Sequence, residues 1–518
     1  MKNNKNKFFK LLAFIAAAGT VAAAAAGCGN TQTSTDSNSL TYWVRLHPNI
    51  GTSVTNLGET PFAKAYSEKT GINVTYIHPA QGQEEEALNI LLAAGDLPDI
   101  IETDWLSREP ESSIANKTII ALNDLVDNGA PNLKKYLQEN PQIDKEIKTD
   151  SGKYYVFPFI RNSDKLLSTS GFMLRGDWLE DLNLEAPQTI DEWEQVLTAF
   201  KEKKGAACPF VGGIYQLKCF AGAYNVGYDF YVDDGKVKYG CIEDGFGEFL
   251  KTINRWYENG LIDKNFSLMD NDYITSSIIG GKSGASFGAG GGALGVWSNT
   301  AKNNGDTKYK LVAAEFPTTQ KGTKPEFGNK QLPYSPLNGA AITGNCKNPE
   351  LAAKFLDYSY SEEGSMLNNF GIEGESYEMV DGQPKYTELI TNNPDKLPMA
   401  QILTMYVRAS IEGPFIQDER YIDQYYQLDT QRDALVKWSD NNHQNHIMPQ
   451  VTLSEEELSE YNRIMTDFTT YRDENINAFI IGSRPISEFG NFVNECKSKN
   501  IEKAIAIYQQ AYDRFVNR

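Results

Sequence analysis

The residues with the most chemical character lie between Gly280 and Trp297, which read GGKSGASFGAGGGALGVW. Three motif fragments stand there side by side. GKS is the end of a loop that cradles phosphate with backbone N–H groups, and GASFG fits the GxSxG turn that exposes a nucleophilic serine. GGGALG fits the GxGxxG fingerprint of dinucleotide-binding proteins. Each fragment predicts a different chemistry, and the flanking residues decide between them.

The phosphate and dinucleotide motifs both lack a required part. GxxxxGK[ST] needs glycine at position 276, where the chain has Ser276. Gly290, Gly292 and Gly295 fit GxGxxG, and Glu315 lies at about the spacing expected of a ribose-binding acid. However, this fingerprint opens a helix, and residues 296–308 are rich in Asn, Lys and Gly and predict a short helix at most. We therefore predict no nucleotide cofactor.

The GxSxG motif, formed by Gly284, Ser286 and Gly288, lacks the elements that would frame it. In α/β-hydrolases an apolar strand precedes the serine and a helix follows it. Glycines stand on both sides here, although His443 and His446 lie downstream in the order that such a triad needs. A catalytic serine is therefore the less favoured interpretation, and we predict no catalytic residue.

Histidines and cysteines do not form a complete metal site in the sequence. His443 and His446 have the spacing of a metal-binding pair, but a zinc site needs three or four ligands, so we predict a loop there and no metal. Cys208 and Cys219 could form a disulfide. The cysteines after Cys28 fit no zinc spacing, and their odd number leaves at least one unpaired in a monomer: Cys208, Cys219, Cys241, Cys346 and Cys496.

The first 27 residues predict a lipoprotein signal peptide. Four lysines lead into an apolar run, Leu11–Ala26, that is shorter than the roughly 20 residues needed to span a bilayer. The run ends in Ala-Ala-Gly before Cys28, which resembles a bacterial lipobox, so Cys28 is the predicted lipidation site. Residues 28–39 are polar and predict a flexible tether. The alternative is an ordinary secretory signal followed by a chance cysteine.

The charge of the chain argues against nucleic acid as a partner. The full sequence has a formal net charge of −19. Removing residues 1–27 would take away four lysines and no acids, leaving 45 basic and 68 acidic residues. An acidic surface repels the phosphate backbone of nucleic acids. No second long apolar run occurs, so we predict a body held outside the cell.

The pattern of apolar residues predicts an α/β fold. About 490 residues are too many for one core, so we also predict two or more lobes. Strands and helices alternate in the first half. A capping box, Thr189 to Glu192, opens a helix with one apolar face, and Asn348-Pro349 opens another. The predicted early elements are strands at 40–44, 72–77 and 98–101, and helices at 61–69 and 84–94.

Several segments together resemble family 1 extracellular solute-binding proteins of ABC importers. They are LAAGDLPDI at 92–100, GKYYVFP at 152–158, LRGDWL at 174–179 and NPELAAKFLD at 348–357. GIEGESY at 371–377 and the ending YQQAYDRF at 508–515 are similar to the large lipoprotein branch of this family in Gram-positive bacteria. The resemblance runs from about Leu40 to the end.

The resemblance implies a two-lobed, periplasmic-binding-protein-like clamp with an interlobe hinge and discontinuous lobes. The implied lobes are 40–155 with 305–372, and 156–304 with 373–518. It also implies a monomer, lipid-anchored on the outer face of the cell membrane, that captures an oligosaccharide and delivers it to ABC transporter permease subunits. Two alternatives stay open, namely a surface glycosidase or esterase, and a receptor for a peptide or an acidic sugar.

The same resemblance assigns the glycine stretch to a wall of the ligand cleft, ending in Trp297-Ser298-Asn299. Aromatic rings would stack on sugar rings, while carboxylates and arginines would bind hydroxyls. Core packing is the alternative for each aromatic residue, and Glu373 and Tyr377 can serve to fix the hinge. The predicted ligand-binding residues are Trp43, Asp104, Trp105, Arg161, Tyr224, Tyr228 and Trp297.

Overall fold

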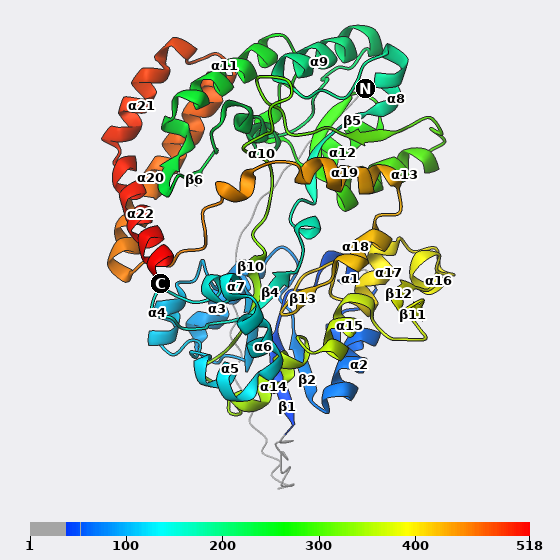
Figure 1. Cartoon of the computed structure of the whole chain (residues 1–518), viewed down its shortest axis with the longest axis vertical. Helices are drawn as coiled ribbons and strands as arrows, with labels where there is room; N and C mark the ends of the chain where they lie inside the picture. Colours follow the sequence, from blue (N-terminus) through cyan, green and yellow to red (C-terminus); the bar gives the residue numbers. More distant parts are fainter. Residues whose placement is uncertain (1–37, 52) are drawn as a thin grey trace, which may run out of the picture. The chain divides into compact units, whose positions relative to one another are not determined.

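A computed structural model of the chain describes residues 38–51 and 53–518 (Figure 1). Residues 38–518 form one compact unit. The predicted signal peptide, the predicted lipidation site Cys28 and nearly all of the predicted tether lie outside the described residues. Within the described part, no helix is both long and apolar enough to cross a membrane.

The first lobe is built on a six-stranded sheet in the order β13-β4-β10-β3-β1-β2. Strand β10 runs antiparallel to its neighbours β3 and β4, and the other pairs are parallel. The carboxyl ends of β1, β3 and β4 therefore lie at one edge of the sheet, together with the beginning of β10. The strands are β1 (Ser39–Trp43), β2 (Asn73–Ile77), β3 (Ile100–Thr103), β4 (Phe157–Arg161), β10 (Tyr334–Ile342) and β13 (Ile416–Gln417).

Both faces of this sheet are buried. Successive residues of a strand point to opposite faces, so Tyr42, Ile100 and Ala340 join a large cluster on one side. Trp43 and Ile101 join a smaller cluster on the other side. The lobe also contains a hairpin of two strands, β11 (Tyr377–Val380) and β12 (Gln383–Tyr386). Its helices are α1 (Pro48–Gly51), α2 (Pro61–Thr70), α3 (Glu84–Ala94), α4 (Pro110–Ala115), α5 (Asn123–Gly129), α6 (Pro131–Glu139), α7 (Pro141–Glu146), α14 (Pro349–Tyr358), α15 (Glu362–Phe370), α16 (Glu388–Thr391), α17 (Met399–Tyr406) and α18 (Glu419–Tyr425).

The second lobe is built on a three-stranded sheet in the order β8-β5-β9. Phe172 of the central strand contacts Trp193, Phe220 and Phe287 in an aromatic core. The elements are β5 (Ser170–Arg175), β6 (Phe230–Asp233), β7 (Lys236–Tyr239), β8 (Ala285–Ala289), β9 (Leu311–Ala313), α8 (Gly176–Leu182), α9 (Ile190–Lys204), α10 (Ile214–Leu217), α11 (Asp244–Glu258), α12 (Asn271–Ile279), α13 (Val296–Asn303), α19 (Asp429–Ser439), α20 (Glu455–Ile480), α21 (Phe489–Ser498) and α22 (Ile501–Asn517).

Local sequence signals explain many of the boundaries. Helix α2 begins after Thr60, whose side chain accepts a hydrogen bond from the Ala63 N–H, and ends at Gly71 with φ of +67°. The predicted capping box at α9 is present, with Thr189 and Glu192 bonding each other's backbone N–H groups. These interactions satisfy N–H groups that have no partner inside a helix. The early strands and helices predicted from the sequence are confirmed.

The chain crosses between the two sheets through residues 162–169, 314–333 and 426–428, so each lobe is discontinuous. The strand pairing differs from the predicted lobe boundaries. The predicted first segment of lobe 2 began at 156, yet β4 pairs with β10 and β13 in the first sheet. Conversely, β9 lay in the predicted lobe 1 but pairs with β5 in the second sheet. The apolar sequence of β4 suits a strand that is buried on both faces, but does not say which sheet it joins.

The cysteines among the described residues are free thiols. The Cys208 thiol lies 2.9 Å from the Ser283 hydroxyl, and the Cys219 thiol contacts the Tyr215 carbonyl. The disulfide considered between Cys208 and Cys219 is therefore absent from the described structure.

Candidate functional site

A polar network lies at the edge where the parallel strands of the first lobe end. Arg161 is the last residue of β4, and its Nη2 donates to Oε1 of Glu412 at 2.7 Å. Asn338, on β10, donates to the other carboxylate oxygen of Glu412. Arg45, two residues beyond β1, reaches Oδ1 of Asn338 at 3.4 Å. Ligands of open α/β sheets bind at this edge, so the network is the first candidate wall.

The backbone that carries Glu412 is held in an uncommon conformation. Glu412 has φ of +66°, a region that residues with a side chain rarely adopt. Arg408 holds it there, donating to the Glu412 carbonyl from Nε at 3.1 Å and from Nη2 at 2.9 Å. The structure thus fixes the carboxylate of Glu412 in place, and such strain is typical of functional sites.

Arg408 is itself anchored by a buried carboxylate. Its Nη2 lies 2.6 Å from Oε1 of Glu102, and both side chains are less than a tenth exposed. The Tyr42 hydroxyl donates to the second oxygen of Glu102 at 2.6 Å. Burial, followed by the nearby charge of Glu102, raises the pKa of Tyr42 well above its usual value, so Tyr42 remains a donor. This network connects the strand core to the Glu412 loop.

A second wall is a groove of about 340 Å³ in the second lobe. It is formed by β8, by the π-helical turn Gly290–Gly295 (η6), and by α10 and α12. Tyr215 of α10 keeps 55% of its surface exposed, and its ring packs edge-on against Phe287. None of the twelve residues that line this groove is charged: Ser170, Tyr215, Gln216, Asn271, Ile274, Thr275, Phe287, Gly288, Ala289, Gly292, Ala293 and Trp297.

Part of the glycine stretch lines this groove, but its serine does not face it. The Ser286 side chain is fully buried, and its hydroxyl donates to the Val211 carbonyl at 2.8 Å. Trp297 is only 5% exposed, and its Nε1 donates to the Thr275 hydroxyl at 3.1 Å. Trp297 therefore lines the groove with little of its surface exposed.

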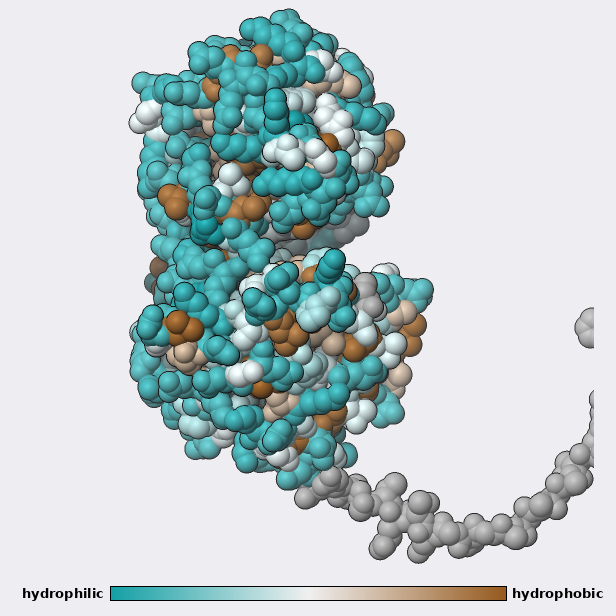
Figure 2. Space-filling view, turned by 90° about the vertical axis from the view of Figure 1, so that its right-hand side faces the viewer, coloured by the Kyte–Doolittle hydropathy of each residue, from teal (hydrophilic) through white to brown (hydrophobic). Residues whose placement is uncertain are grey.

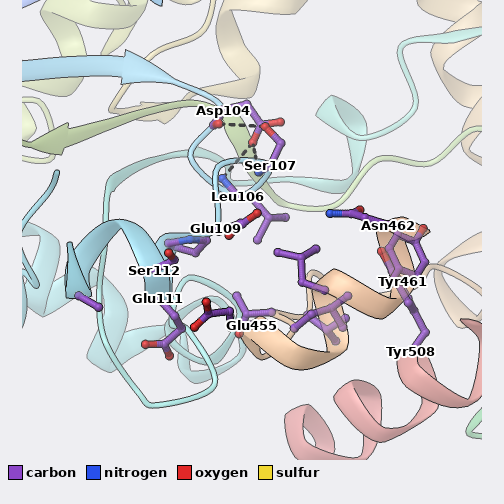
Figure 3. Close-up of a pocket in the computed structure, with 16 residues that line it drawn as sticks. Asp104, Leu106, Ser107, Glu109, Glu111, Ser112, Glu455, Tyr461, Asn462 and Tyr508 are labelled. Atoms are coloured by element: carbon purple, nitrogen blue, oxygen red, sulfur yellow. Dashed lines mark hydrogen bonds between the residues drawn. The ribbon is translucent and has the colours of Figure 1, made fainter. Parts of the chain in front are cut away.

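A cavity of about 530 Å³ lies where α4 and the turn before it meet α20 and α22 (Figure 3). Asp104 lines it and also accepts hydrogen bonds from the backbone N–H groups of Leu106 and Ser107 at 3.0 and 3.2 Å. In Figure 3, Tyr461 and Asn462 lie on the side of the cavity opposite Glu111 and Ser112. The space-filling view shows the surface hollowed at the level where the two lobes meet (Figure 2).

This cavity is acidic. Asp104, Glu109, Glu111 and Glu455 line it, whereas no lysine or arginine does. Burial opposes ionisation of Glu111, but hydrogen bonds from Ser151 and neighbouring groups outweigh it and hold the pKa of Glu111 at about 2. Glu111 is therefore charged at neutral pH.

The structure distributes the predicted ligand-binding residues over several places. Asp104 lines the acidic cavity, Arg161 belongs to the polar network, and Trp297 borders the groove. Tyr228 lines a further cavity. The Tyr224 hydroxyl lies 2.7 Å from the Thr252 hydroxyl, and its ring packs on the core of the second lobe.

The two tryptophans of the first lobe correct the sequence prediction. Trp43 is 4% exposed and Trp105 is completely buried, within one core cluster on a face of the six-stranded sheet. The Trp105 Nε1 donates to the Ile101 carbonyl at 3.0 Å. Helices cover both faces of this sheet, so a large apolar ring at the end of a strand packs under them. Neither ring offers a face to a ligand in this structure.

Sequence reasoning missed Arg45, Asn338, Glu412 and Tyr215. Arg45 had a usable signal, since it follows the end of a predicted strand, where ligands of α/β sheets bind. Tyr215 sits in a helix of four residues, which is too short to show periodicity. Asn338 and Glu412 come close only through tertiary folding.

The two downstream histidines were predicted to lie in a loop, but His443 begins a short 3-10 helix, η7 (His443–Asn445), and His446 caps its end. His446 contacts the Val232 carbonyl at 3.1 Å and the Glu326 carboxylate at 3.2 Å, and its ring stacks on Phe327. Burial lowers the pKa of His443 to about 4. Within residues 38–51 and 53–518, no group of three potential His, Cys, Asp or Glu ligands is arranged to hold a metal.

The sequence matches the model of the family described as bacterial extracellular solute-binding protein over residues 53–366. It is 27% identical to the fructooligosaccharide ABC transporter substrate-binding protein FusA of Streptococcus pneumoniae serotype 4 (strain ATCC BAA-334 / TIGR4), covering 86% of each chain. It is 24% identical to lipoprotein LipO of Bacillus subtilis (strain 168), covering 72% of this chain and 74% of LipO.

Two solved structures have the same two-lobed fold. The alginate-binding protein AlgQ2, crystallised without calcium ion, matches with a TM-score of 0.74 at 26% identity, covering 92% of this chain and 99% of AlgQ2. FusA of S. pneumoniae in complex with kestose matches with a TM-score of 0.73 at 22% identity, covering 93% of this chain and all of that one.

Proposed function

The chain belongs to the family of bacterial extracellular solute-binding proteins, and from this premise we propose that it captures an oligosaccharide and delivers it to an ABC importer. The observation that carries the proposal is the position of the two walls beside one crossing of the chain. Arg161 of the polar network ends β4, and Ser170 of the groove begins β5. Residues 162–169 alone separate them in sequence.

The chemistry of these walls suits sugars. Tyr215 offers an exposed aromatic face for the apolar C–H face of a sugar ring, and amide and hydroxyl side chains beside it can bond hydroxyl groups. Arg161 and Glu412 provide charged donors and acceptors on the other lobe. The relative FusA is described as a fructooligosaccharide-binding protein, which supports the same class of ligand.

The protein acts as a receptor and returns the sugar unchanged. The one serine in a hydrolase-like motif, Ser286, is buried and bonded to backbone, which leaves it no path to a substrate. A secreted glycosidase or esterase is the alternative. Incubation with a labelled oligosaccharide followed by chromatography distinguishes them, because cleavage products would contradict the receptor proposal.

The receptor is held at the outer face of the membrane by a lipid on Cys28, acts as a monomer, and hands its cargo to permease subunits. The Ala-Ala-Gly-Cys sequence after the apolar run supports the lipid anchor. A diacylated cysteine supplies two chains, which is what stable anchoring requires.

A glycan array probed with residues 29–518, followed by calorimetry on the best ligands, tests the function. We expect saturable binding of at least one oligosaccharide class. Small-angle scattering should show a smaller radius of gyration with that ligand, because both lobes contact it. If the protein bound peptides and no glycan, its cargo would be a peptide, and the proposal would be refuted.

A further inference from the structure

The groove of the second lobe has an uncharged lining that bears on which sugars can enter. Its polar groups are amides and hydroxyls, namely Gln216, Asn271, Thr275 and Ser170, beside the exposed ring of Tyr215. Such groups bond sugar hydroxyls, but none of them neutralises a carboxylate. An anionic ring that leaves water for this surface would lose hydration without gaining a counter-charge.

The charged groups around the groove do not supply the counter-charge that an anionic sugar ring would need. Lys218 lies 5.3 Å from the centre of the Tyr215 ring, but it pairs with Asp229 at 3.7 Å and lines a different cavity. Arg161 of the other lobe is paired with Glu412. The acidic cavity beside α4 adds negative charge. Arg45 is exposed and belongs to the polar network of the other lobe, where it donates to Asn338.

Glycine at position 292 leaves open space in the groove. The other glycines of η6 and its neighbour β8 are needed for packing. A Cβ on Gly288 would lie 2.7 Å from Ala293, and one on Gly290 would lie 2.8 Å from Tyr426. At Gly292, apart from its chain neighbours and the backbone of its own helix, no described heavy atom comes within 4 Å of that Cβ position, and φ is not in the left-handed region. The backbone would therefore accept a side chain there, and Gly292 is one of the residues that line the groove.

We propose that this groove selects uncharged sugar rings and that the missing side chain at Gly292 provides the space they occupy. The inference rests on the proposed function, since it names the class of oligosaccharide that the same site takes. Gly292 is a specificity-determining position, because a larger residue there fills the subsite without disturbing the packing around it.

The first experiment measures charge selectivity. Calorimetry on the mature protein compares neutral oligosaccharides, including kestose, maltotriose and raffinose, with trigalacturonate, and a glycan array extends both sets. We expect at least tenfold tighter binding of the best neutral ligand than of any uronate. Preferential or equal binding of uronates would overturn the inference and leave the proposed function standing. No binding of any glycan in either set would overturn both.

The second experiment tests Gly292 with a matched control. Gly490 is also a helical glycine with open space at its Cβ position, but it lies on α21, outside the groove. We expect Gly292→Leu to weaken binding of the best neutral ligand at least tenfold and Gly490→Leu to leave it unchanged. Gly292→Ala, the smaller variant, should weaken binding by less than Gly292→Leu and serves if the leucine variant does not fold. Unchanged or tighter binding by folded Gly292 variants would overturn the role of this position.

Discussion

Tyr215 and Trp297 border the same groove, and their different burial predicts different consequences of substitution. Tyr215 is 55% exposed, whereas Trp297 is 5% exposed and hydrogen-bonded to Thr275. Tyr215→Ala removes a ring that supports little of the core. We therefore expect the urea midpoint of unfolding to stay near that of the wild type while sugar binding weakens.

The size of the loss at Tyr215 follows from the contact that it makes. An aromatic stacking contact contributes about 0.5–1.5 kcal/mol beyond area burial, so Tyr215→Ala should weaken binding by roughly two- to thirteenfold. Tyr215→Phe keeps the ring and is the control, and it should bind within about twofold of the wild type. Calorimetry with the best ligand from the glycan array measures both variants.

Trp297→Ala should behave as a core variant. Replacing a buried aromatic side chain by alanine costs about 3–5 kcal/mol of unfolding free energy, so loss of binding should come with a clearly lower urea midpoint. If the Trp297→Ala protein were as stable as the wild type but did not bind sugar, the Trp297 ring would instead be a stacking contact for the ligand. Normal binding by Tyr215→Ala would refute the assignment of the groove.

Three further predictions concern the buried charges and the anchor. Glu102→Gln leaves the buried guanidinium of Arg408 without its counter-charge, and urea unfolding should show a loss of about 3–5 kcal/mol; no loss would contradict the burial of this pair. The pKa of His443 is lowered to about 4 in the fold, whereas an unfolded histidine takes up its proton near 6.5, so stability should fall by up to about 3 kcal/mol as pH drops from 6.5 to 4. Unfolding measured at both pH values should show a smaller fall in His443→Gln, and an equal fall would refute the assignment. Cys28→Ser should release the protein from membranes or leave the precursor uncleaved in cell fractionation, and a variant that still fractionates as processed lipoprotein would refute the anchor.

The elements with complete local signals were predictable from the sequence. Helices α2 and α9 carry caps whose side chains bond the first backbone N–H groups, and Gly71 ends α2 in the left-handed conformation that suits glycine. These signals act within a few residues, so they hold whatever the tertiary structure is. The strand pairing that assigns β4 to the first sheet depends on residues more than 170 positions apart, and no local pattern specifies it.

The candidate site was only partly predictable for the same reason. The glycine stretch was predicted to form a wall because glycines permit close approach of backbone, and six of its residues line the groove of the second lobe. Trp43 was misplaced because adjacent strand residues point to opposite faces, and the sequence does not say that helices cover both of them. The polar network of Arg45, Asn338 and Glu412 joins three separate segments, so only the folded chain assembles it.

The discontinuity of the lobes has a consequence for how the protein is made. Strand β10 completes the first sheet by pairing with β3, and Ala341 lies opposite Ile101, about 240 residues earlier in the chain. Strand β13 is added later still, at Ile416–Gln417. The sheet therefore cannot be complete until about four-fifths of the chain has been synthesised. Strand pairings between residues so far apart in sequence form slowly. Until Ile416–Gln417 has been synthesised, β4 therefore lacks its partner at the edge of the first sheet.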